Sequence, residues 1–154
     1  MSTPAGAGRA AELLAGMMEH FESSEVGLLF AVDAVEQMTE TLLVLRGNYA
    51  ANGRPGADPG NAVGVTPGPI QMAMADGFGW MLTVDRMPPG SDAFTIDMSM
   101  QFLRPLPVGP FVARCELLRW SPRRSVTTTQ LSPGPDGPTS TFITAAFSPR
   151  SSAG

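Results

Sequence analysis

The segment PGPIQMAMADGFGWMLTV, residues 67–84, constrains the fold more than any other part of the chain. We predict a helix from Pro69 to Val84, because proline is tolerated in the first turn and apolar residues fall on nearly every side. A helix of this kind is stable only when it is buried. Asp76 is its single charged residue, and burying an unpaired carboxylate is costly. The presence of Asp76 therefore needs an explanation.

The segment after this helix alternates regularly between apolar and polar residues. Its apolar positions are Phe94, Ile96, Met98, Met100 and Phe102. A period of two predicts a strand with one buried face.

The remaining patterns are one helix and several strands. Helical spacing covers residues 9–21, two strand-like apolar runs lie within residues 26–45, and further strand patterns occur near residues 110–120, 124–132 and 139–147. A loop rich in glycine and proline spans residues 47–67, and loops of this length inside a compact domain are often functional.

These elements fit one architecture, because a sheet with one apolar face can bury an all-apolar helix by wrapping around it. We predict a single α+β domain over residues 1–154, in which an antiparallel sheet of five to six strands wraps around one long central helix. An additional helix lies at the N-terminus. Residues 1–7 and 148–154 are expected to be flexible.

Composition argues against several classes of protein. The net charge of −4 is spread without a basic stripe, so nucleic acid is not an expected partner. No apolar run approaches the roughly 20 residues of a membrane span, and Glu12 interrupts the one segment that resembles a signal peptide. The single cysteine, Cys115, is best interpreted as a small buried side chain. Because it cannot form a disulfide within the chain, it suggests a reducing compartment, and a cytoplasmic location is expected. One histidine and one cysteine do not make a convincing metal-ligand set.

Two interpretations of Asp76 follow from its position. The carboxylate could bond to a loop backbone, or it could be a general base or nucleophile poised by desolvation. Gly77 and Gly79 follow it, and each glycine in a helix costs about 1 kcal/mol relative to alanine. That cost is explained if a partner helix or a ligand packs against the backbone there.

Three segments carry a resemblance to a known family. They are NAVGVTPGPIQMAMAD from residue 61, FLRP from residue 102, and VGPFVARCELLRWSPRR from residue 108. Over roughly residues 24–148 the chain resembles the hotdog-fold acyl-CoA thioesterases of the phenylacetate-pathway and 4-hydroxybenzoyl-CoA type. In that family an Asn precedes the helix, a Gly marks its start, and an acid follows eight positions later; here these are Asn61, Gly68 and Asp76. The family commonly has His-Gly-Gly where this chain has Pro67, Gly68 and Pro69.

The resemblance implies a thioesterase, and the residue types suit that chemistry. The N–H of Gly68 can stabilise the oxyanion that forms when a thioester is attacked. Asp76 can attack the carbonyl or deprotonate a water, and Asn61 can orient the water or the carbonyl. The expected substrate is an acyl-CoA or acyl-carrier-protein thioester, and no cofactor is expected. The alternative is a non-catalytic acyl-binding or small-ligand-binding protein with the same fold.

Other residues are candidates for substrate binding. Phe78 and Trp80 suit a hydrophobic or aromatic acyl group. Arg104, Arg123 and Arg124 could bind the phosphates of the ligand, or they could be ordinary charges at strand ends.

Helix geometry adds a constraint on assembly. Eight helical residues separate Gly68 from Asp76 by about 12 Å along the axis, so both cannot contact one carbonyl from the same chain. We therefore expect a homodimer or homotetramer in which Gly68 and Asn61 of one chain face Asp76 of another.

Overall fold

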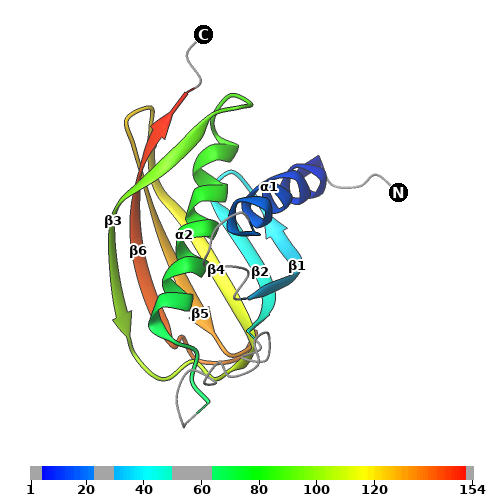
Figure 1. Cartoon of the computed structure of the whole chain (residues 1–154), viewed down its shortest axis with the longest axis vertical. Coiled ribbons are helices and arrows are strands. Elements are labelled where there is room, and N and C mark those ends of the chain that lie inside the picture. The colour runs from blue at the N-terminus through cyan, green and yellow to red at the C-terminus, as the bar shows by residue number, and fades with distance from the viewer. Residues whose placement is uncertain (1–4, 23–29, 50–63, 152–154) are drawn as a thin grey trace.

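The computed structural model describes residues 5–22, 30–49 and 64–151. Within these residues the chain forms a six-stranded antiparallel sheet that curves around one helix, with a second helix beside it (Figure 1). The elements in chain order are α1 (Ala5–Glu22), β1 (Ala31–Met38), β2 (Leu42–Tyr49), α2 (Gly68–Asp85), β3 (Asp92–Phe102), β4 (Gly109–Ser121), β5 (Arg124–Ser132) and β6 (Thr141–Arg150). The predicted fold, a sheet wrapped around a long central helix with an N-terminal helix, is confirmed.

The strand order places β3 at one edge of the sheet. The order is β1-β2-β4-β5-β6-β3, so β3 pairs with β6, the last strand, rather than with β4, the next strand along the chain. Among the described residues no strand pairs with β3 on the side away from β6, and such an edge offers unpaired backbone groups to a further strand.

The core lies between α2 and the concave face of the sheet. Met74, Phe78, Met81 and Leu82 of α2 are fully buried, which confirms the burial predicted for this helix. Gly79 lets α2 approach the sheet closely, because a Cβ there would lie 2.7 Å from two ring carbons of Phe147 and from the Thr127 hydroxyl. The close approach that the sequence attributed to a partner or a ligand is, at Gly79, packing within the chain.

The prediction that one face of β3 is buried is wrong. Phe94, Ile96 and Phe102 are 56%, 52% and 59% exposed. A register shift between Thr95 and Asp97 interrupts the pairing with β6, so residues two apart do not keep one face across this bulge. β3 is also an edge strand, and no strand in the described parts of the chain lies on its other side.

The chain ends differ from the sequence prediction. β6 continues to Arg150, and its residues Ser148 and Arg150 pair with Phe94 and Asp92 of β3. The helical turn at the other end already includes Ala5. Residues 5–7 and 148–150 are therefore part of regular elements where a flexible end was expected, and residues 1–4 and 152–154 lie outside the described residues. No helix in the described parts of the chain is long and apolar enough to cross a membrane.

Candidate active site

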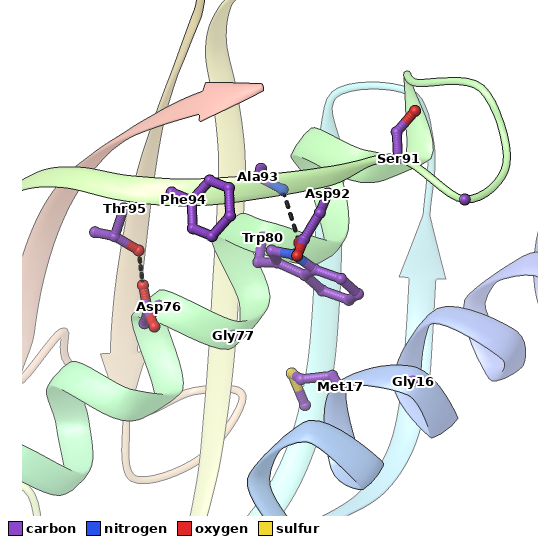
Figure 2. A pocket seen from close by; sticks show the side chains of 11 residues that line it. Gly16, Met17, Asp76, Gly77, Trp80, Ser91, Asp92, Ala93, Phe94 and Thr95 are labelled. Carbon is purple, nitrogen blue, oxygen red and sulfur yellow. Dashed lines mark hydrogen bonds between the residues drawn. The ribbon is translucent and has the colours of Figure 1, made fainter. Parts of the chain in front are cut away.

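Two cavities lie beside α2, one near the middle of the helix and one at its N-terminus. The first has a volume of about 480 Å³ and is lined by Gly16, Met17, Asp76, Gly77, Trp80 and residues 90–95 (Figure 2). The second has a volume of about 450 Å³ and is lined by residues 65–68, Gln71 and residues 102–106. Both volumes are within the range of small-molecule sites.

Asp76 lines the first cavity, and its carboxylate faces β3. The Thr95 hydroxyl donates a hydrogen bond to Oδ1 of Asp76 (Figure 2). Asp76 is half-buried rather than buried, so the expectation of a carboxylate enclosed in the core is wrong. The reason is that Asp76 points towards the edge strand, where the sheet ends, while its neighbours on the helix point towards the sheet interior. Its partner is a side chain, not a loop backbone.

Trp80 and Phe78, both candidates for acyl binding, have different surroundings. Trp80 lines the cavity, and its Nε1–H donates to Oδ1 of Asp92 at 2.8 Å. Phe78 is fully buried, with its ring 5.8 Å from that of Phe30 in an edge-to-face contact and 6.5 Å from that of Phe111. Phe78 is therefore a core residue and cannot contact a substrate in this cavity.

Gly68 lines the second cavity as the first residue of α2. The preceding Pro67 provides no side-chain cap, and the N–H of Gly68 has no partner among the residues that the structure describes. An unpaired N–H at a helix N-terminus lies at the positive end of the helix dipole. The role of this N–H as an oxyanion donor stays a prediction, and its position at the start of α2 is compatible with it.

Gln71 organises this helix start, and the sequence analysis missed it. Its side chain is 2% exposed and donates through Nε2 to the Thr66 carbonyl at 2.9 Å, while its Oε1 accepts a hydrogen bond from Thr141. The amide therefore ties the segment before α2 to both the helix and the sheet. The sequence signal was available, since Gln71 is one of the few polar residues in this largely apolar helix.

Thr95 was missed as well. It occupies a polar position in the alternating segment that predicted β3, and its partner Asp76 is distant in sequence. Only the packing of β3 against α2 brings the two together.

The arginines do not form one group. Arg104 lines the second cavity and makes no ion pair with any described residue. Arg123 and Arg124 lie at the turn between β4 and β5 and line neither cavity. Because β5 and β3 run in the same direction, Arg124 at the start of β5 and Arg104 beyond the end of β3 lie at opposite ends of the sheet. These three arginines therefore do not lie together within one chain, and phosphate binding by Arg123 and Arg124 stays a prediction.

The two halves of the predicted site remain apart within one chain. Asp76 and Gly68 line different cavities, which agrees with the distance expected from helix geometry. Asn61, the third predicted catalytic residue, lies outside the described residues. Cys115 is fully buried in β4, and desolvation raises the pKa of its thiol from 9.0 to about 12, so this thiol is not a nucleophile. No group of three metal-ligating side chains occurs in the described part of the chain.

Comparisons with known proteins agree with this fold. A mutant thioesterase from Pseudomonas aeruginosa is similar with a TM-score of 0.70 and 17% identity, covering 97% of this chain and 96% of that one. A hypothetical thioesterase protein with coenzyme A from Streptococcus pneumoniae has a TM-score of 0.65 and 14% identity, with coverage of 92% and 98%. A phenylacetic acid degradation-related protein from Ralstonia eutropha has a TM-score of 0.61 and 21% identity, with coverage of 91% and 98%.

At these identities the solved structures establish the fold. No curated protein matches the sequence significantly. Residues 64–137, which include α2 and the strands β3 to β5, match the family model of the thioesterase superfamily. This match covers just under half of the chain, and the sheet wrapped around α2 is the hotdog fold.

Proposed function

We propose that this protein hydrolyses acyl-CoA or acyl-carrier-protein thioesters at a site shared by two copies of the chain. The observation that carries the proposal is the position of the two half-sites along the edge strand β3. Thr95, near the start of β3, contacts Asp76, and Phe102, at the end of β3, lies 3.1 Å from a Cβ built on Gly68. The carboxylate and the free N–H are thus at opposite ends of one exposed strand.

A second copy paired along this edge would bring the half-sites together. When two identical strands pair antiparallel about a two-fold axis, the start of each strand lies beside the end of the other. The Asp76 end of one chain then faces the Gly68 end of its partner. Pairing would also cover a set of exposed apolar side chains, and such patches mark interfaces. The set is Met72, Phe94, Ile96, Phe102 and Leu103.

The proposed reaction is general-base hydrolysis. Oδ2 of Asp76 takes a proton from a water, whose oxygen attacks the thioester carbonyl, and the N–H of the partner's Gly68 stabilises the oxyanion. The C–S bond then breaks, and the thiolate leaves with the proton that Asp76 had taken. The hydrogen bond from Thr95 to Oδ1 supports this role, because it fixes the carboxylate and leaves Oδ2 for the water. Asn61 is proposed to orient the water or the carbonyl.

Arg104 is the proposed contact for the phosphates of the substrate. It lines the same cavity as Gly68, and its guanidinium is unpaired among the described residues, a setting suited to a phosphate. The thioesterase-named structure from Streptococcus pneumoniae, which contains coenzyme A, supports a substrate of this class.

The first experiment measures hydrolysis of an acyl-CoA panel by thiol release. Asp76→Asn should lower kcat by about 10²–10⁴-fold, the usual contribution of a general base. Asp136→Asn is the matched control, because Asp136 is exposed and lines neither cavity. Unchanged hydrolysis in Asp76→Asn would rule out the mechanism. If Asp76 is instead the nucleophile, single turnover in H₂¹⁸O would place the label in its side chain.

A second experiment isolates the oxyanion donor. Gly68→Pro removes the N–H, whereas Gly68→Ala keeps it and adds a similar Cβ next to Phe102. We expect the proline variant alone to lose about 10²–10³-fold in kcat. Mixing Asp76→Asn chains with Gly68→Pro chains should restore activity, because the mixed dimer contains one intact site. No restoration in a confirmed mixed dimer would rule out a shared site.

The second candidate function is acyl binding without turnover. Pro67 and Pro69 at the start of α2, where the family commonly has His and Gly, favour it. A shift in melting temperature with acyl-CoA, without hydrolysis at any chain length, would support binding alone.

A further inference from the structure

The first cavity has a wall from outside the segment that matches the thioesterase superfamily. Residues 64–137 supply Asp76, Gly77, Trp80 and the start of β3, but Gly16 and Met17 come from α1. Figure 2 shows α1 on one side of the cavity and β3 on the other, with Trp80 between them. The cavity therefore depends on how this chain packs its own N-terminal helix.

The cavity extends from the proposed reaction centre along α2. Asp76 is at one end, and Trp80 lies four residues further along the helix, about 6 Å along its axis. An acyl group whose carbonyl is next to Asp76 can thus extend towards the indole. The indole of Trp80 is held in place by Asp92. The carboxylate of Asp92 accepts one hydrogen bond from Nε1–H of Trp80 at 2.8 Å and another from the N–H of Ala93 at 2.7 Å.

Gly16 leaves open the space in front of the indole. A Cβ at Gly16 would lie 4.0 Å from Cη2 of Trp80, with no other heavy atom nearer than 4 Å. Glycine in a helix interior costs about 1 kcal/mol relative to alanine, and at this position it keeps the cavity accessible beside Trp80. A side chain larger than alanine would take up space next to this edge of the indole.

We propose that the cavity between α1, Trp80 and the start of β3 is the acyl pocket, and that Gly16 sets the length of acyl group it accepts. This inference rests on the proposed thioesterase function. The ligand is an apolar acyl group, linear or aromatic, that extends past the carbonyl to lie against the indole of Trp80. The apolar side chains of Met17 and Phe94, which also line the cavity, fit that class.

The test compares Gly16→Leu with Gly8→Leu. Both substitutions replace a glycine of α1 with leucine, but a Cβ at Gly8 meets nothing within 4 Å. The substrates are acetyl-, butyryl-, octanoyl- and phenylacetyl-CoA. Gly16→Leu should keep acetyl-CoA hydrolysis and lower kcat/KM for octanoyl- and phenylacetyl-CoA by about 10-fold or more, since one methylene group changes such discrimination by 10–200-fold. Gly8→Leu should behave as wild type. Equal effects of Gly16→Leu on all four substrates, or none, would overturn the inference.

A binding measurement separates this inference from the thioesterase proposal. In Trp120→Phe protein, Trp80 is the remaining tryptophan of the two in the sequence. Titration with non-hydrolysable octyl-CoA and methyl-CoA thioethers should change Trp80 fluorescence more for the octyl compound, and Gly16→Leu should remove that difference. If the protein binds in this way without hydrolysis, the pocket stands and the thioesterase proposal fails. If hydrolysis occurs while octyl-CoA leaves Trp80 unchanged, the pocket is wrong and the thioesterase proposal stands.

Discussion

Replacing Gly79 with alanine tests how α2 packs against the sheet. The new Cβ would lie 2.7 Å from Cε2 and Cζ of Phe147 and from Oγ1 of Thr127, whereas carbon atoms in favourable contact are about 3.5–4.0 Å apart. Phe147 is fully buried, and protein interiors are too densely packed to yield this space freely. The helix or the ring must therefore move.

The expected loss of stability is the difference between two effects. Adding volume to a packed core costs about 1–3 kcal/mol, and three contacts at 2.7 Å place Gly79→Ala near the upper end of that range. Replacing a helical glycine with alanine contributes about 1 kcal/mol in the opposite direction. The free energy of unfolding should thus fall by about 2 kcal/mol, a decrease in Tm of about 4–8 °C for a chain of this size.

The assay is urea unfolding at one fixed protein concentration, followed by far-ultraviolet circular dichroism. Gly16→Ala is the control, because it gains the same helix propensity but its Cβ approaches no atom closer than 4.0 Å; it should be as stable as wild type or up to about 1 kcal/mol more stable. If Gly79→Ala matched that control, with an unchanged denaturant slope, the space beside Phe147 would be larger than the structure shows. Gly79 would then need another explanation.

Three further predictions concern the site and its surroundings. Thr95→Val should lower kcat by about 10-fold because Asp76 loses its hydrogen bond, and Thr95→Ser should retain activity; equal losses in both variants would contradict this role. Arg104→Ala should raise KM for an acyl-CoA but not for the matching acyl-N-acetylcysteamine thioester, which has no phosphate; equal KM changes for both would contradict a phosphate contact. Cys115 should resist a disulfide reagent at pH 8 until the protein unfolds, because burial raises the pKa of its thiol to about 12; rapid labelling of folded protein would contradict that. Its contribution to stability is fully present below pH 9 and is lost as the pH rises towards 12, since only the unfolded chain ionises there.

Local patterns predicted the elements of this fold well. The apolar surround of residues 69–84 indicated a buried helix, and it is buried because a helix without a polar face has no stable alternative. The spacing of Gly68 and Asp76 followed from the same helix geometry, and the structure places them in separate cavities. These features depend on the periodicity of the helix, which can be read directly from the sequence.

Burial of individual side chains could not be predicted in this way. Phe78 and Trp80 are both apolar and two residues apart, so they point in nearly opposite directions from the helix; only the position of the sheet made one a core residue and the other a cavity wall. The alternation in β3 predicted a buried face, but burial depends on strand order, and β3 lies at the edge.

The contacts of Asp76 show what the sequence determined and what the tertiary structure added. The sequence established that one carboxylate lies within the apolar segment of residues 67–84 and that this residue needs a partner. The tertiary structure decided that the partner is Thr95 and that the carboxylate opens onto a cavity bounded by α1. The physical reason is that helix periodicity is fixed by neighbouring residues, whereas the pairing of β3 with β6 joins segments about 50 residues apart and depends on the whole sheet.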